Sequence, residues 1–213
     1  MENPDQPHNI VSGLWQKFRQ GDYELLGEIF QDQYNELYFY GLKLVPLAEL
    51  VKDTIQDVFA NIWNRRQKMN EINNIKAYLF ISIRHELLHR VEKLRKQSPL
   101  SDNLTEPFDF SVEDFLVREE TGSKTTRLLV QSLKKLTERQ REVILLRFNH
   151  ELEFQEIAQV MGMNIQSVRN LLFRAIENIR KDLNHQNIEG TADVEIFLFS
   201  VFQKRKMKNL SAI

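Results

Sequence analysis

Two histidines one helical turn apart have the spacing in this chain that most directly suggests chemistry. His85, Glu86 and His89 belong to the segment HELLH, which matches the pattern in which two histidines hold zinc and the glutamate is a general base. A zinc protease needs a third ligand, and the downstream candidates, Glu106 and Glu113, lie in an acidic segment without a helical ligand motif. A zinc metalloprotease is therefore a distant alternative. We predict no metal site, no cofactor and no catalytic residue.

A second group of residues has the chemistry to contact DNA. In the segment 154–174, Ala158, Gly162 and Val168 have the spacing of two short helices that cross at a tight turn. Gly162 can adopt positive φ there, and Asn164 is typical of an N-cap of the second helix. An ordinary helical hairpin with a Gly turn is the alternative, and the agreement of spacing, cap and exposed side chains favours a helix-turn-helix. Polar side chains on the outer face could bind base edges and phosphates: Gln166, Ser167, Arg169, Asn170 and Arg174.

Helices must position both groups, and the apolar periodicity predicts them. Apolar residues recur every three or four positions within 14–40, 55–63, 78–94 and 128–148, which is the spacing of helices with one apolar face. Thr137, with Gln140 three residues later, predicts a capping box. With only seven Gly and five Pro in 213 residues, a turn-rich β-protein is disfavoured. We predict an all-α fold.

The charges alternate along the chain and mark its domains. The net charge is −1, yet residues 1–60 carry 4 basic and 10 acidic side chains, 61–96 carry 9 and 3, 97–123 carry 1 and 7, and 124–181 carry 11 and 6. Simple solvated faces are one explanation, and two DNA-facing patches are the other. We expect two small helical domains, at 10–96 and 124–183, joined by an acidic linker at 97–123 and followed by an extension at 184–213.

The composition also bears on location. The chain has no Cys, so it offers no disulfide framework and suits a reducing compartment. Its first residues lack the basic start and apolar run of a signal peptide. No apolar run reaches the ~18 residues of a membrane span. These features predict a cytoplasmic protein.

Two segments resemble one protein family. The stretch Leu133 to Lys181 resembles the C-terminal DNA-binding region of bacterial sigma factors of the extracytoplasmic-function (ECF) group, and KDTIQDVFANIW with NIKAYLFISIRHELLHRVEKLRK is similar to that group's other domain. The resemblance covers roughly Phe18 to Lys181 and implies a sigma factor that binds core RNA polymerase and promoter DNA. It also implies an anti-sigma partner and no small-molecule substrate. The alternative is a stand-alone helix-turn-helix regulator whose first domain senses a ligand or dimerises.

The resemblance assigns roles to residues of this sequence. The first domain would dock on polymerase through an acidic helix face, unless that face is merely solvated, and the second would read the minus-thirty-five element through its helix-turn-helix. The docking face would be Asp53, Gln56 and Asp57. The loop from Asn64 to Asn74 and the helix after it would contact the minus-ten element through Arg65, Arg66, Lys68, Arg84, His85, His89 and Arg90.

The extension departs from this pattern. It carries an apolar run at 194–202 followed by KRKMK, and the run is too short to span a bilayer. It could pack on the second domain, bind an inhibitory partner, or lie on a membrane surface with help from the basic cluster. The sequence leaves these three open.

Overall fold

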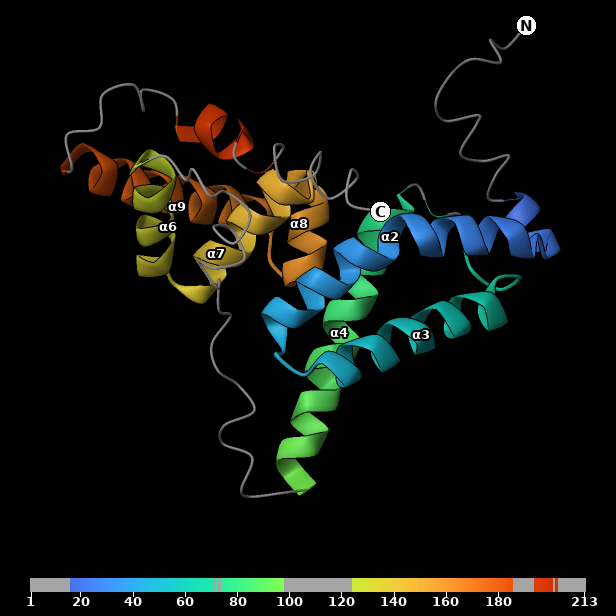
Figure 1. Cartoon of the computed structure of the whole chain (residues 1–213). Helices are drawn as coiled ribbons and strands as arrows, with labels where there is room; N and C mark the ends of the chain where they lie inside the picture. The colour runs from blue at the N-terminus through green and yellow to red at the C-terminus, as the bar shows by residue number, and fades with distance from the viewer. Residues whose placement is uncertain are drawn as a thin grey trace, which may run out of the picture. The chain divides into compact units, whose positions relative to one another are not determined.

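The computed structural model describes residues 16–70, 72, 74–97, 124–185, 194–200 and 202. Within these ranges the chain is helical and contains no strand (Figure 1), which confirms the all-α prediction. The chain divides into two compact units, Met1–Glu106 and Pro107–Ile213. None of the described helices is long and apolar enough to cross a membrane. The acidic segment 98–123 lies outside the described residues.

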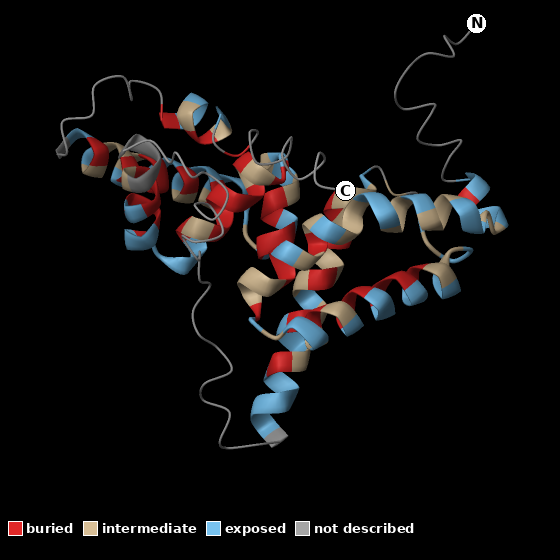
Figure 2. Cartoon of the chain, in the orientation of Figure 1, coloured by how far each residue is buried: buried red, intermediate tan, exposed pale blue. Residues whose placement is uncertain are grey.

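In the described part of the first unit, a helical segment at 16–20 precedes α2 (Tyr23–Leu44), α3 (Ala48–Arg65) and α4 (Ile75–Gln97). Each of these three longer helices packs against the other two. Asp22 caps α2 by accepting a hydrogen bond from the Leu25 N–H at 3.1 Å, and Asn74 caps α4 by accepting one from the Ala77 N–H at 3.1 Å. Each helix turns its apolar stripe inward (Figure 2). The fully buried centre of this unit contains Leu37, Tyr40, Val51, Ile55, Leu79, Phe80, Ile83 and Leu87.

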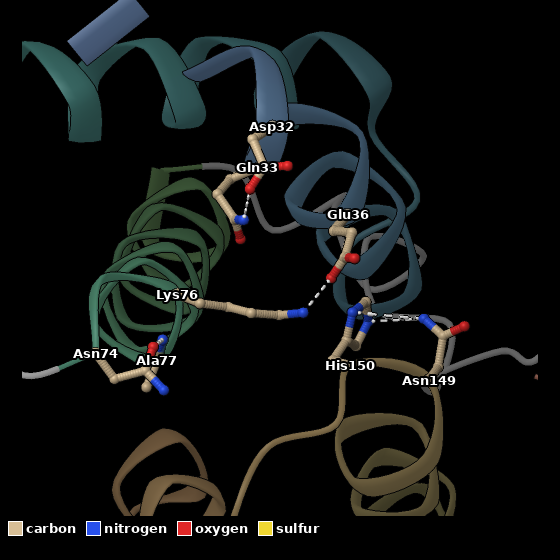
Figure 3. A network of polar contacts seen from close by, with 8 residues as sticks. All are labelled: Asp32, Gln33, Glu36, Asn74, Lys76, Ala77, Asn149 and His150. Atoms are coloured by element: carbon tan, nitrogen blue, oxygen red, sulfur yellow. Dashed lines mark hydrogen bonds and ion pairs between the residues drawn. The ribbon is translucent and has the colours of Figure 1, made fainter. Parts of the chain in front are cut away.

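Close packing and ion pairs hold these helices together. A Cβ placed on Gly41 of α2 would lie 2.6 Å from Val51 Cγ1 of α3, so the absence of a side chain at Gly41 allows the two helices to approach. Lys76 Nζ lies 2.8 Å from Glu36 Oε2, which links α4 to α2 (Figure 3).

The second unit contains α6 (Lys124–Lys135), α7 (Glu138–Ile144), the π-helical turn η2 (Leu145–Asn149), α8 (Phe154–Met161) and α9 (Ile165–His185). α9 packs against α6, α7 and α8. Thr137 starts α7 with the predicted capping box: its N–H donates to Gln140 Oε1 at 3.1 Å, and its hydroxyl accepts from the Gln140 N–H at 3.4 Å.

The π-helical turn was not predicted from the sequence. Its wider ring is closed by the His150 N–H, which donates to the Leu145 carbonyl at 3.1 Å. The side-chain amide of Asn149 lies 3.3 Å from Nε2 of the buried His150 (Figure 3). The turn places Phe148 in the interior of the unit.

The described part of the C-terminal extension forms a helix at 194–200. The Phe199 ring meets Phe148 edge to face, with centroids 4.8 Å apart. The sequence left open whether the apolar run packs on the second domain, binds an inhibitory partner or lies on a membrane. In the structure it packs on the second unit.

Candidate nucleic-acid interface

The turn between α8 and α9 has the geometry that the sequence predicts. Gly162 ends α8 in the left-handed region, with φ 62° and ψ 41°. The Met163 N–H donates to the Ala158 carbonyl at 2.9 Å, which is the long hydrogen bond of a Schellman motif. Asn164 then caps α9, because its Oδ1 accepts the Ser167 N–H at 2.7 Å. The turn therefore fixes the direction in which α9 leaves α8.

A second cap, at the start of α8, was not predicted. Glu153 and Glu156 form a capping box, in which the Glu153 N–H donates to Glu156 Oε2 at 2.7 Å. Glutamate is uncommon at an N-cap, so residue types alone do not indicate this box. With Asn164, it fixes the beginning of both helices of the helix-turn-helix.

The two faces of α9 differ in burial and in polarity. Val168, Leu172, Ala175 and Ile179 are buried against the unit. The predicted DNA-contacting residues lie on the opposite face: Gln166, Arg169, Asn170 and Arg174 are exposed, and Ser167 is half-buried. No acidic residue occurs in α9 before Glu177, so this face suits a phosphate backbone.

Phe173 belongs to the same outward face and was missed by the sequence reasoning. Its side chain is 65% exposed, although Phe is usually buried. Its position seven residues after Gln166 and four after Arg169 places it on their stripe of the helix, and this spacing is the signal that could have found it.

An aromatic ring holds one of the predicted arginines. The Arg169 guanidinium lies 5.5 Å from the Phe154 ring centroid, and that of Arg147 lies 5.1 Å from it. Arg147 is itself fixed, since it donates to the Leu152 carbonyl at 2.9 Å and pairs with Glu153 at 3.1 Å. Phe154 thus connects Arg169 of α9 with Arg147 of η2, which is held by its own hydrogen bonds. Because these residues come from separate elements, no local sequence pattern indicates the contact.

Gln166 and Asn170 also contact each other. Gln166 Nε2 donates to Asn170 Oδ1 at 3.1 Å along one turn of α9. The bond aligns two amides on the exposed surface, with the Asn170 amide hydrogens and the Gln166 carbonyl oxygen free to bind base edges.

In the first unit, the predicted polymerase-binding residues lie on the outer side of α3. Asp53 and Gln56 are exposed. Asp57 is 56% exposed and accepts a hydrogen bond from Arg90 of α4, with Oδ2 and Nη2 2.6 Å apart. Arg90 also binds Glu86 at 2.8 Å. Although burial works against the charged form, the hydrogen bonds to Asp57 and Glu86 outweigh it and raise the pKa of Arg90.

The loop after α3 contains three predicted DNA contacts in different settings. Arg65 and Lys68 are exposed. Arg66 is half-buried: its guanidinium lies 4.1 Å from the Trp63 ring centroid, and its Nη1 donates to the Trp63 carbonyl at 2.9 Å. Arg19 Nη2 holds the next residue by donating to the Gln67 carbonyl at 2.9 Å. The structure therefore gives Arg66 a place in the packing of the loop.

The HELLH segment lies in α4. His85 and His89 are exposed one turn apart, while Arg84 is half-buried. Glu86, the base of the zinc-protease pattern, accepts a hydrogen bond from Arg90 Nε at 2.8 Å. No group of three or more His, Cys, Asp or Glu in the described ranges could hold a metal, and Glu106 and Glu113 fall in the undescribed segment.

Comparison with known proteins agrees with this arrangement. Residues 29–97 match the family model of sigma-70 region 2, and 126–179 match that of sigma-70 region 4. The sigma factor YlaC of Bacillus subtilis is 26% identical over 166 residues, covering 76% of this chain and 94% of that protein. The ECF sigma factor SigM of the same organism is 23% identical over 156 residues, covering 73% of this chain and 93% of its own.

Two solved structures show the same fold. The sigma factor RpoE of Bartonella quintana, crystallised with the anti-sigma factor NepR, gives a TM-score of 0.51 at 20% identity and covers 74% of this chain and 97% of its own. CnrH, in complex with the cytosolic domain of CnrY, gives a TM-score of 0.51 at 19% identity, with 81% of this chain and 96% of that chain covered. The chain belongs to the sigma-70 family, in its ECF group.

Proposed function

We propose that the two domains act as separate promoter-binding arms of a sigma factor that directs core RNA polymerase to its start sites. The observation that carries this proposal is the exposed, acid-free face of α9 on a helix-turn-helix that is capped at both of its helices. Both sigma-70 regions lie in one chain in the order that such a factor needs. We place the two domains at 10–96 and 124–183, with the acidic linker 97–123 between them.

The second domain would read the minus-thirty-five element through α9. The amides of Gln166 and Asn170 can bond base edges in the major groove, and Ser167 and Arg169 lie beside them near the start of the helix. Arg174, two turns further along, is suited to a flanking phosphate. Phe173, on the same face, offers an apolar surface to a thymine methyl group.

The first domain would dock on core polymerase through Asp53, Gln56 and Asp57. An exposed face with two carboxylates and an amide complements basic side chains on a partner. Here Asp57 offers less free charge than Asp53, because Arg90 already neutralises part of it.

The minus-ten element would meet the loop after α3 and the middle of α4. Arg65, Lys68, His85 and His89 are exposed there and can reach phosphates or an unstacked base. Arg84 and Arg90 would add positive charge beside them. Arg66 would act chiefly by holding the loop, since its guanidinium stacks on Trp63.

The chain would have no catalytic activity of its own, because polymerase supplies the chemistry of RNA synthesis. Its place of action would be the cytoplasm, where polymerase and the chromosome are. The sigma factors RpoE and CnrH were solved in complexes with NepR and CnrY. By analogy we propose that an anti-sigma factor also controls this chain.

Transcription in vitro tests the proposal. Purified protein and core polymerase, given a library of genomic fragments, should yield transcripts from defined start sites, and core polymerase alone should not. Arg169→Ala should reduce these transcripts at least about fivefold, since a base contact contributes about 1–3 kcal/mol. Gln131→Ala, an exposed polar position on α6, is the matched control and should leave them unchanged.

A DNA-binding assay without polymerase, together with this transcription assay, distinguishes a stand-alone regulator from a sigma factor. A regulator would shift duplex DNA in the absence of polymerase and would give no start-specific transcript with it. That combination of results would refute the proposed function.

A further inference from the structure

The C-terminal extension carries a helix that neither family model covers. The region 4 match ends at residue 179, and the helix spans 194–200. Val194, Leu198 and Phe202 follow one another at four-residue intervals and are all buried. Ile196, on the other side, is 66% exposed. The segment is therefore amphipathic and has its apolar face covered.

The surface that receives this helix is on the DNA-binding domain. Phe199 meets Phe148 edge to face, with ring centroids 4.8 Å apart and planes at 79°. Phe148 lies in the π-helical turn η2 and is buried while the extension is in place. A π-helical turn inserts extra backbone into a helix and is frequent at functional sites. Here it presents an aromatic ring as one side of a helix-binding surface.

The extension leaves the DNA-reading face open. Gln166, Arg169, Asn170 and Arg174 stay exposed while Leu198 and Phe202 are buried. The helix at 194–200 therefore does not occupy the position of DNA on α9, and it can be seated during promoter binding.

We propose that the surface at Phe148 is a helix-binding site whose resident ligand is the chain's own segment 194–202. The ligand that this site would bind is an amphipathic helix with apolar side chains at positions i, i+4 and i+8 and an aromatic residue at i+5. The tether gives this segment a high effective concentration, so it closes the site against other helices. The inference rests on the packing of the second unit and not on the proposed promoter contacts.

Thiol labelling tests the proposal in the full-length protein. The chain has no Cys, so a single introduced thiol is read without background. The thiol of a Leu198→Cys protein, at a buried position, should react with a soluble disulfide reagent at least about ten times more slowly than that of an Ile196→Cys protein, at an exposed position. Equal rates at the two positions would overturn the proposal.

A second substitution tests the aromatic contact. In the Leu198→Cys protein, Phe199→Ala should speed labelling several-fold, because the ring that holds the helix against Phe148 is lost. Phe199 lies outside the region 4 match, so its loss leaves the helix-turn-helix intact, as retained binding to promoter DNA would verify. Ser200→Ala, at an exposed position of the same helix where the hydroxyl donates to the Phe197 carbonyl, is the control and should leave the rate unchanged. An unchanged rate in the Phe199→Ala protein would contradict the assigned site.

Discussion

Arg90 of α4 donates a hydrogen bond to Asp57 of α3, with Nη2 and Oδ2 2.6 Å apart. The bond connects a residue predicted to bind polymerase with one predicted to contact DNA. Asp53, one turn earlier on α3, is exposed and forms no ion pair within the described part of the chain. The two carboxylates of the proposed docking face are therefore not equivalent.

This difference predicts distinct effects of two similar substitutions. Asp53→Asn should weaken binding to core polymerase about fivefold, for a loss of about 1 kcal/mol, without changing the unfolding temperature. Asp57→Asn should also destabilise the domain, by less than about 1 kcal/mol, because a partly exposed ion pair contributes little. Binding titrations and thermal unfolding measure both effects, with Glu28→Gln on α2 as an exposed control. Wild-type affinity in the Asp53→Asn protein would rule out the docking face.

Phe154 should act on DNA binding through Arg169. Because the Arg169 guanidinium lies 5.5 Å from the Phe154 ring centroid, Phe154→Ala should weaken binding to a minus-thirty-five duplex, and Phe154→Tyr should restore it. A double-mutant cycle with Arg169→Ala should give a coupling of about 0.5–1 kcal/mol, the size of an exposed cation–π contact. Additive losses would show that Phe154 does not position Arg169.

Gly162 should be sensitive to any side chain. Its φ of 62° is in the left-handed region, while an added Cβ would meet no atom within 4 Å. Gly162→Ala should therefore destabilise the second domain by roughly 1–2 kcal/mol through backbone conformation alone. Gly27→Ala in α2 is the matched control, since it also has open space but should stabilise its helix by up to about 1 kcal/mol. Denaturant unfolding followed by circular dichroism distinguishes the two, and equal effects would refute the explanation.

At Gly41 space is limiting instead. A Cβ there would lie 2.6 Å from Val51 Cγ1, so Gly41→Ala should cost about 1–3 kcal/mol of stability, which is typical of overpacking. In a Val51→Ala background that cost should shrink, because the colliding methyl group is gone. An undiminished cost in the second background, measured by denaturant unfolding, would place the strain elsewhere.

The features that could be predicted from the sequence are those set by neighbouring residues. The capping box at Thr137, the cap at Asn164 and the positive φ of Gly162 are confirmed. Each depends on residue types within about four positions, as do the apolar stripes that predict the helices. The all-α fold follows from the same short-range signals.

The features that could not be predicted join distant parts of the chain or depend on packing. The Asp57–Arg90 pair crosses between helices, and the partners of Phe154 come from η2 and α9. The π-helical turn has no periodicity that separates it from the α-helix before it. The composition of the extension was compatible with packing on the second domain, with a protein partner and with a membrane surface. The contact of Phe199 with Phe148 shows the first of these.

The division of α9 into two faces has an evolutionary consequence. Residues that hold the helix in the domain, such as Val168 and Leu172, are separate from those proposed to meet DNA, such as Gln166 and Asn170. Substitutions on the outer face therefore leave the interior packing unchanged and carry little penalty in stability. A duplicated copy of this gene could acquire new target promoters by a few such changes, so the regulon can diverge much faster than the fold.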